Sequence, residues 1–233
     1  ITRILTPGTV IEEGMLQARK NNWLASVVSE EIQSKNHSKI LWGLASADVS
    51  TGEFLVTEYE SLEALKQEIA KLQPSEIILS KSNSNNLAKY ISEDSYIKTI
   101  EASYFSNYEA KSALIKHYQI KTINGLGIDE FELALKAAGG LIGYLSTTKP
   151  TGIEDKNNQD LKPIPLDYPR FIAPEDSLLI DVQTRRNLEL TATQRDGKFH
   201  GSLLWAIDRT LTCMGGRCLR QWIEKPLINL NEI

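Results

Sequence analysis

The chain has 233 residues, and its 41% hydrophobic content is enough for the core of one large domain or of two ordinary ones. A formal net charge of −4 argues against non-specific binding of nucleic acid by the whole chain, although it leaves room for a local basic patch. No segment approaches the roughly eighteen apolar residues of a membrane span, and no charged leader precedes an apolar stretch, so the usual marks of membrane and secreted proteins are missing. The first residue is not Met, so we expect a piece cut from a longer chain.

The first part of the chain predicts a lead-in followed by three antiparallel strands. Residues 1–20 contain the turn signal TPGT and then a short helical pattern, without the alternation of a core strand. Residues 22–31 (NWLASVVSEE) place apolar side chains on one face, as a strand requires, and residues 40–59 contain two further strand-like runs. Gly52 lies between these two runs and can take the positive φ of a tight hairpin turn.

The pattern then changes to alternating helices and strands. Ser61 is expected to be the N-cap of a helix over residues 61–73, which Pro74 ends. The elements that follow are predicted as a strand at 76–80, a helix at 84–93, a strand at 96–102 and a helix at 107–118. Three strands followed by α and β units is the element order of a ribonuclease H-like α/β fold, a mixed sheet with flanking helices.

Residues 128–148 give the clearest helical pattern of the chain. Asp129 and Glu132 resemble a capping box at its start. The apolar stripe consists of Phe131, Leu135, Ala138, Ile142 and Leu145. Gly139 and Gly143 would each cost about 1 kcal/mol relative to Ala in a helix, so we predict that they allow a neighbouring backbone to approach closely.

A proline-rich segment, residues 149–176, separates this helix from a more basic helical region. It holds five of the eight prolines, and we predict an irregular connector that acts as a hinge. Beyond it, two helical patterns each have an apolar face, formed by Leu203, Leu204, Ile207 and Leu211 in residues 202–211 and by Met214, Cys218 and Trp222 in residues 214–225. The predicted division of the chain is a lead-in at 1–20, a domain at 21–148, a linker at 149–176 and the beginning of a helical domain at 177–233.

Residues that could carry catalysis do not gather into a known motif. A two-metal nuclease on this fold needs several converging carboxylates, but the run NWLASVV (residues 22–28) of the first strand has no acid, and Asp48 is placed to hydrogen-bond within the following turn. No Walker-type phosphate loop is present, since NGLG at 124–127 lacks the following Lys. Cys213 and Cys218 lack the partners of a zinc site, and we expect two reduced thiols in a cytosolic protein. A metal-dependent nuclease is therefore the disfavoured alternative.

Residues 181–190 (DVQTRRNLEL) raise a separate question, because two adjacent arginines can bind phosphate, form ion pairs or simply face solvent. If Asp181 begins a helix, its carboxylate can cap the free amides of the first turn. Asp181, Arg185 and Glu189 then fall in one row, so that Arg185 is a scaffold residue between two acids. Arg186 lies about 100° around the helix and is expected to reach another element. The candidate scaffold and interdomain residues are Asp181, Thr184, Arg185, Arg186, Asn187 and Glu189.

The same stretch resembles a known family. TRRNLEL at 184–190 and GSLLWAIDRTLTCMGGRCLRQWIEKPL at 201–227 resemble the start of the core domain in the MutS family of bacterial DNA mismatch-repair proteins. ITRILTPGT at 1–9 and DVSTGEF at 48–54 resemble the segments that enter and form the connector domain of that family. The resemblance covers essentially the whole chain, with the motifs in the correct order.

The resemblance implies a connector domain, ribonuclease H-like without its catalytic acids, followed by the first core helices. In the family, the connector joins mismatch binding to the ATPase core and offers a surface to MutL. Signatures for mismatch recognition, for encircling DNA and for binding ATP and Mg do not occur here, so we expect no catalytic, cofactor or metal residue in this chain. The full-length protein is expected by resemblance to be a DNA-dependent ATPase, a homodimer, and cytoplasmic in association with the nucleoid. No connector residue that contacts MutL can be carried over from the family.

Overall fold

The structure is a computed structural model, and it describes residues 6–9, 19–34, 37–81, 95–148, 164–174, 178 and 180–231. These residues form two compact units. Within the described ranges, the first unit contains residues 22–172 together with 6–9, and the second contains residues 173–231 together with 19–21. The chain therefore leaves the first unit, contributes a short segment to the second, and returns before the first strand begins.

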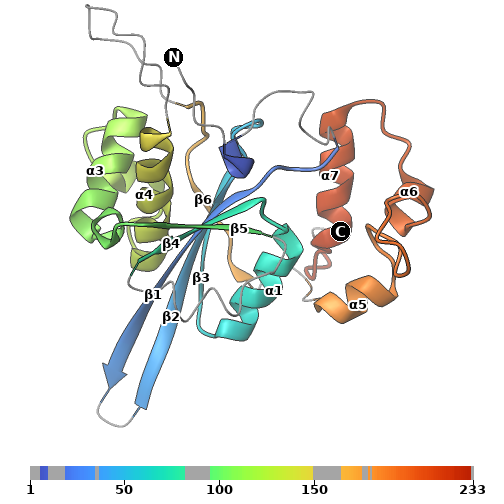
Figure 1. Ribbon diagram of the computed structural model, residues 1–233, viewed down its shortest axis with the longest axis horizontal. Coiled ribbons are helices and arrows are strands. Elements are labelled where there is room, and N and C mark those ends of the chain that lie inside the picture. Colours follow the sequence, from blue (N-terminus) through green and yellow to red (C-terminus); the bar gives the residue numbers. More distant parts are fainter. Residues whose placement is uncertain are drawn as a thin grey trace, which may run out of the picture. The chain divides into compact units, whose positions relative to one another are not determined.

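The first unit is built on a six-stranded mixed sheet (Figure 1). The strands are β1 Leu24–Ser34, β2 His37–Ala47, β3 Phe54–Tyr59, β4 Glu76–Ser80, β5 Tyr96–Ile100 and β6 Arg170–Phe171. Their order in the sheet is β5-β4-β1-β2-β3-β6. β2 is antiparallel to β1 and to β3, whereas β4 runs parallel to β1 and β5 parallel to β4. The expectation of a mixed α/β sheet is confirmed.

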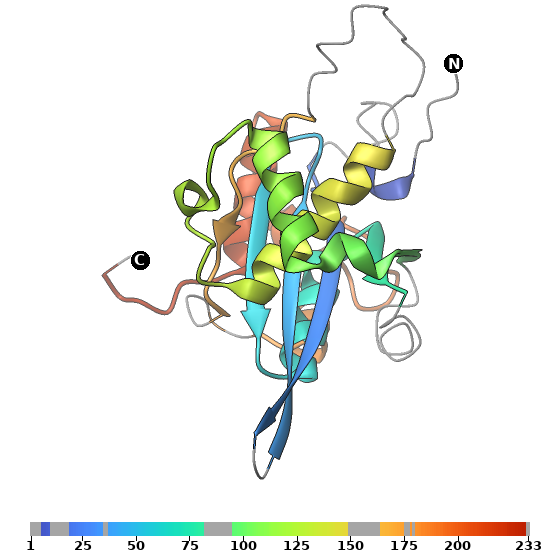
Figure 2. The ribbon, with the colours of Figure 1, turned by 90° about the vertical axis from the view of Figure 1, so that its left-hand side faces the viewer.

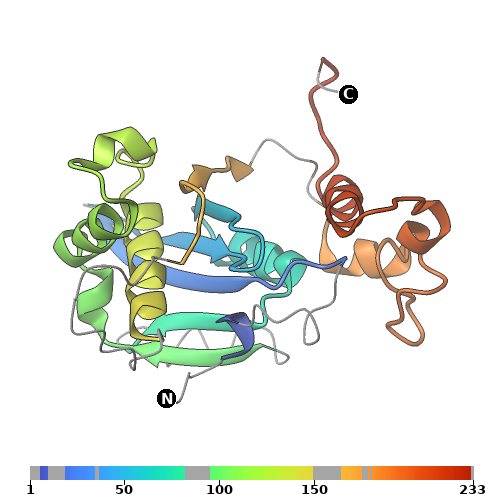
Figure 3. The same ribbon diagram turned by 90° about the horizontal axis from the view of Figure 1, so that it is seen from above.

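Helices cover both faces of this sheet. The helices of the first unit are α1 Leu62–Leu72, α3 Asn107–Tyr118 and α4 Glu132–Thr147, with short 3-10 turns η1 Pro7–Thr9, η3 Ala102–Phe105 and η4 Ile123–Leu126. α3 and α4 lie on one face and α1 lies on the other (Figures 2 and 3). Ser61 caps α1, as predicted, by accepting a hydrogen bond from the amide of Ala64. The helix predicted at 84–93 lies outside the described residues.

β1 contributes side chains to two hydrophobic clusters, one on each face of the sheet. Because successive residues of a strand point to opposite faces, Leu24 and Val28 pack in the cluster under α3 and α4, while Ala25 and Val27 pack in the cluster under α1. All four side chains are buried, so the strand is sandwiched between two helical layers. Apart from Ser26, which is also buried, this segment of β1 is apolar, as a strand covered on both faces requires.

The hairpin of β1 and β2 extends beyond the rest of the sheet (Figure 2). The two strands pair over their full lengths, but β4 pairs only with Leu24–Val27 and β3 only with Trp42–Ala47. The predicted strands at 22–31 and from residue 40 are therefore too short, because the polar ends of the hairpin carry no apolar alternation. At the β2–β3 turn, Gly52 has φ of 85° and its amide donates to the carbonyl of Asp48, as the hairpin prediction requires.

The start of α4 differs from the predicted capping box. Phe131 occupies the N-cap position and makes no side-chain cap hydrogen bond, so the box of Asp129 with Glu132 was wrong. The cap is supplied instead from the sheet by Glu58, a long-range contact that local spacing cannot reveal. The close backbone approach predicted at the helix glycines is confirmed for Gly139, where a Cβ would lie 2.3 Å from the Cα of Ala110 in α3; the neighbour of Gly143 is instead the ring of Tyr104.

The segment after α4 contains a strand that its composition did not indicate. Residues 149–163 and 175–177 lie outside the described part of the chain, and the predicted hinge at 149–176 stays a prediction. Residues 170–171, however, form β6, which pairs in parallel with Leu55 and Val56 of β3. Phe171 also stacks on Phe131, with ring centroids 3.6 Å apart. Two paired residues are too few to leave an alternating pattern in the sequence.

The second unit is helical, with α5 Val182–Asn187, α6 Leu203–Ile207 and α7 Cys213–Glu224. The helix predicted over residues 202–211 is present but shorter, because α6 ends at Ile207, and Leu211 therefore lies outside it. Of the four residues of the predicted apolar face, only Leu204 is buried. On α7, Met214 and Trp222 are largely exposed. Cys213 and Cys218 are free thiols, as expected. No helix among the described residues is both long and apolar enough to cross a membrane.

Candidate functional site

The arginine-bearing stretch begins with the capped helix that the sequence predicts. Asp181 is the N-cap of α5, and its carboxylate accepts hydrogen bonds from the amide of Thr184 at 2.7 Å and from the Thr184 hydroxyl at 2.9 Å. These hydrogen bonds, the backbone one first, lower the pKa of the Asp181 carboxyl, since they favour its charged form. The helix continues only to Asn187, whose side-chain Oδ1 accepts a hydrogen bond from the side-chain Nε2 of Gln183.

The predicted row of Asp181, Arg185 and Glu189 does not form, because α5 ends before Glu189. Glu189 has φ of 48°, in the left-handed region, which turns the chain away from the helix axis. Its carboxylate accepts from the amide of Gln194 at 2.6 Å, and its carbonyl accepts from the amide of Leu203 at the start of α6. Glu189 therefore organises the connection from α5 to α6.

The two arginines have different environments. Arg185 is half-buried, and its guanidinium donates to the carbonyl of Ile180 at 3.1 Å and to the carbonyl of Glu224 at the end of α7. Arg186 is exposed, and its side chain makes no hydrogen bond or ion pair with any residue that the structure describes. Arg185 thus ties α5 to α7, and Arg186 faces outward.

A group of charges surrounds the end of α7. Burial raises the pKa of the Glu224 carboxyl, against the opposing effect of the charges on Arg220, Arg185 and Lys20. Arg220 pairs with this carboxylate at 3.4 Å. Burial also lowers the pKa of Lys20, and the nearby charge of Arg220 lowers it further. Cations that converge on one carboxylate and on helix-end carbonyls suit a scaffold that fixes α5 against α7.

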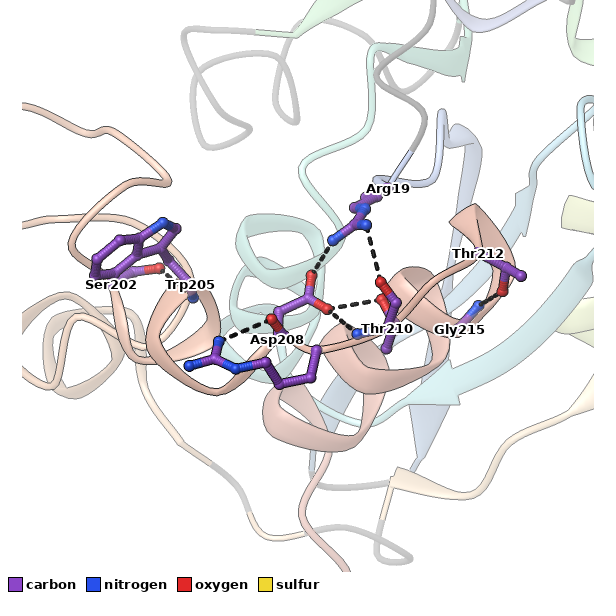
Figure 4. Close-up of polar contacts among 8 residues, drawn as sticks. Arg19, Ser202, Trp205, Asp208, Thr210, Thr212 and Gly215 are labelled. Atoms are coloured by element: carbon purple, nitrogen blue, oxygen red, sulfur yellow. Dashed lines mark hydrogen bonds and ion pairs between the residues drawn. The ribbon is translucent and has the colours of Figure 1, made fainter.

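A second polar cluster lies at the bend between α6 and α7 (Figure 4). The sequence did not indicate this cluster. Asp208 accepts hydrogen bonds from the amide of Thr210 at 2.9 Å and from its hydroxyl at 2.7 Å. Arg19 donates to the other carboxylate oxygen of Asp208 at 2.7 Å and to the carbonyl of Thr210 at 3.0 Å. Thr212 then caps α7 by accepting from the amide of Gly215. The Asp-x-Thr spacing is a signal for the turn, but nothing local marks Arg19, which lies 189 residues away along the chain.

The buried acids of the first unit serve the structure of the fold. Asp48 accepts hydrogen bonds from the amides of Asn22 and Ser50, which confirms its predicted part in the turn. Glu76, at the start of β4, accepts from the amide of Gly8 at 3.0 Å and from the Tyr144 hydroxyl. Within the described ranges, no three or more His, Cys, Asp and Glu residues are grouped so that they could hold a metal ion.

Comparison with known proteins places the chain in a family. The family model described as MutS domain II matches residues 22–158, and the one described as MutS domain III matches residues 183–233. Proteins named DNA mismatch repair protein MutS are similar over nearly the whole chain: that of Prochlorococcus marinus (strain MIT 9303) is 51% identical over 234 residues, covering 100% of this chain and 25% of the relative. That of a second strain of Prochlorococcus marinus is 55% identical over 232 residues, with 98% and 25% covered. That of Synechococcus sp. (strain CC9311) is 52% identical over 230 residues, with 98% and 24% covered.

Each of the two family matches falls within one of the two structural units. The domain II match falls on the α/β unit, and the domain III match falls on the helical unit that holds α5, α6 and α7. The chain spans about a quarter of the length of the curated relatives it matches. The chain belongs to the MutS family of DNA mismatch repair proteins and carries its domain II followed by its domain III residues.

Proposed function

We propose that this chain is the connector and core segment of a MutS-type mismatch repair ATPase, in which it links mismatch binding to the ATPase core without doing chemistry itself. The observation that carries the proposal is the order of its two family domains. A domain II match on the α/β unit is followed by a domain III match on the helical unit, and the relatives that share both are named DNA mismatch repair proteins. We infer that the first unit is the connector and that the second begins the core.

The strand order supports a ribonuclease H-like fold for the connector. Three consecutive antiparallel strands are followed by β4 on the far side of β1 and then by β5, both parallel to β1. Helices α3 and α4 cover one face of this sheet and α1 covers the other. This is the arrangement expected from the element order of that fold.

The alternative, a metal-dependent nuclease on the same fold, needs carboxylates that are free to bind metal ions. Two of the buried acids next to β1 are Asp48 and Glu76, and each accepts at least two hydrogen bonds from neighbouring protein groups. Such carboxylates are committed to the turn and to the N-terminal segment, which favours the adaptor. Magnesium- or manganese-dependent DNA cleavage by the pure chain, lost in Asp48→Asn, would establish the nuclease instead.

The remaining activities belong to the longer protein. The relatives are about four times as long as this chain. We propose that mismatched DNA, ATP with Mg, and homodimer formation involve the rest of such a protein, which acts in the cytoplasm at the nucleoid. The negative net charge of −4 predicts weak DNA binding by this chain, without preference for a mismatch.

The connector also provides a docking surface for MutL in this proposal. The test is to titrate the chain with purified MutL, with and without ATP, and to measure association by light scattering or calorimetry. Association of the chain with MutL supports the docking role. Absence of association at micromolar concentrations under both conditions would remove MutL docking from the proposal and leave the linking role to be tested in the longer protein.

A further inference from the structure

Arg19 completes the bend between α6 and α7, although it precedes β1 in the sequence. It donates to Asp208 and to the carbonyl of Thr210, the two residues that form the turn after α6 (Figure 4). Its aliphatic stem lies against α7 at Gly216, where an added Cβ would be 3.0 Å from the Cγ and 3.1 Å from the Cδ of Arg19. One side chain therefore contacts both the turn and the helix that follows it.

The residues on either side of this segment belong to the first unit. The amide of Gly8 donates to Glu76 of β4, and the amide of Asn22 donates to Asp48 at the end of β2. Residues 19–21, between these two anchors, group with the helical unit. The family matches start at residues 22 and 183, so neither of them includes Arg19.

We propose that residues 19–21 are an integral segment of the domain III unit, and that Arg19 is the positioning residue that holds α6 and α7 in their bend. The bend therefore keeps its structure only while this segment, which precedes domain II, stays in place. Displacing that segment releases the turn at Asp208 and the start of α7, while the turns inside the first unit keep their own hydrogen bonds. Residues 19–21 thus act as a strap that keeps α6 and α7 in order.

The geometry of this contact differs from that of an ordinary surface ion pair. Pairs between two exposed side chains contribute little, because water screens them and both side chains lose freedom. Here the Asp208 side chain is only 4% exposed, while that of Arg19 is 46% exposed. The guanidinium makes two directed hydrogen bonds, and its stem covers the glycine face of α7. Removing it leaves the Asp208 carboxylate without its charged partner.

The test uses the whole chain and reads hydrogen exchange at single amides. In Arg19→Ala, the amides of Asp208 and Gly216, which donate to Leu204 and Thr212, should exchange about tenfold faster or more. The amide of Leu133 in the first unit should be unchanged. The matched control is Lys39→Ala, which removes the exposed pair with Glu60 and should leave exchange in the second unit as it is. Unchanged exchange at Asp208 and Gly216 in Arg19→Ala would overturn the proposal.

A second variant separates the strap from a general loss of stability. Gly216→Ala places a methyl group against the stem of Arg19, so it should speed exchange within α7 when Arg19 is present. In the Arg19→Ala background the same change should slow exchange within α7, because Ala is the better helix residue. This reversal of sign is specific to contact between the two residues. An identical effect of Gly216→Ala in both backgrounds would also contradict the assignment.

Discussion

Glu58, on β3, caps helix α4 by accepting hydrogen bonds from the amide of Leu133 at 2.8 Å and from the next amide along the helix at 3.0 Å. The first amides of a helix have no partner within it, and an anion placed there also interacts favourably with the helix dipole. A residue of the sheet thereby fixes where α4, a largely buried helix, begins. The contact spans 75 positions in the sequence.

Glu58→Ala should destabilise the first unit by about 1–2 kcal/mol, the usual cost of losing an N-cap acceptor. Glu58→Gln keeps an oxygen acceptor and should cost less. The measurement is chemical denaturation, followed by a signal from the first unit. Glu60→Ala is the matched control, because Glu60 is 81% exposed and pairs only at the surface with Lys39. Equal losses for Glu58→Ala and Glu60→Ala would show that the cap contributes nothing.

Replacing each of two glycines of α4 by Ala should lower the stability of the chain by different amounts. A Cβ at Gly139 would lie 2.3 Å from the backbone Cα of Ala110, whereas a Cβ at Gly143 would lie 2.6 Å from a ring carbon of Tyr104. A ring can rotate aside, but a packed backbone cannot. Gly139→Ala should therefore cost about 1–3 kcal/mol, as overpacking does, and Gly143→Ala should cost less. If thermal denaturation shows that Gly139→Ala stabilises the chain, the close helix packing is refuted.

The sequence predicted the elements whose signals are local. Ser61 capped its helix as expected, and the turn at Asp48 and Gly52 was identified from residue type and spacing. The failures are long-range: the Glu58 cap replaced the expected capping box, and β6 pairs through only two residues. Neither contact leaves a periodic pattern, because each is made by residues far apart in the chain.

Arg185 and Arg186 should differ in their effect on the second unit. Arg185→Ala removes hydrogen bonds to the carbonyls of Ile180 and Glu224, and should cost about 1–3 kcal/mol, as charged hydrogen bonds do. Arg186→Ala should stay within about 0.5 kcal/mol in this chain, the range of surface substitutions. Melting of the two variants, monitored in the second unit, is the measurement. A larger loss for Arg186→Ala would mean that its partner lies within these 233 residues.

Acid should weaken the bend between α6 and α7. Hydrogen bonds from the side chain and then the backbone of Thr210, together with Arg19, lower the pKa of the Asp208 carboxyl. A carboxyl whose folded-state pKa is lowered contributes stability that is present above its unfolded pKa of about 4 and is lost as the pH falls below it. Exchange at Gly216 should therefore accelerate as the pH falls below about 4, after correction for intrinsic rates. Asp208→Asn should flatten this dependence, and an unchanged slope in that variant would assign the effect to other groups.

The candidate site could be predicted only in part from its residues. Asp181 was identified correctly as an N-cap, because that role depends on the next three residues alone. The row through Glu189 failed because helix length is set by the tertiary contacts of Glu189, whose carbonyl holds the start of α6. Arg19 was missed for the same reason, since its partners at 208 and 210 follow the whole first unit in the sequence.

The most direct test of the adaptor function is hydrogen exchange of the whole chain with and without purified MutL. The proposal predicts slower exchange at a contiguous surface within residues 22–148, in the unit that matches MutS domain II. The same samples should show neither ATP hydrolysis nor cleavage of DNA with magnesium present. Slowed exchange confined to the second unit, or no change at MutL concentrations that saturate a longer MutS protein, would contradict a connector that docks MutL.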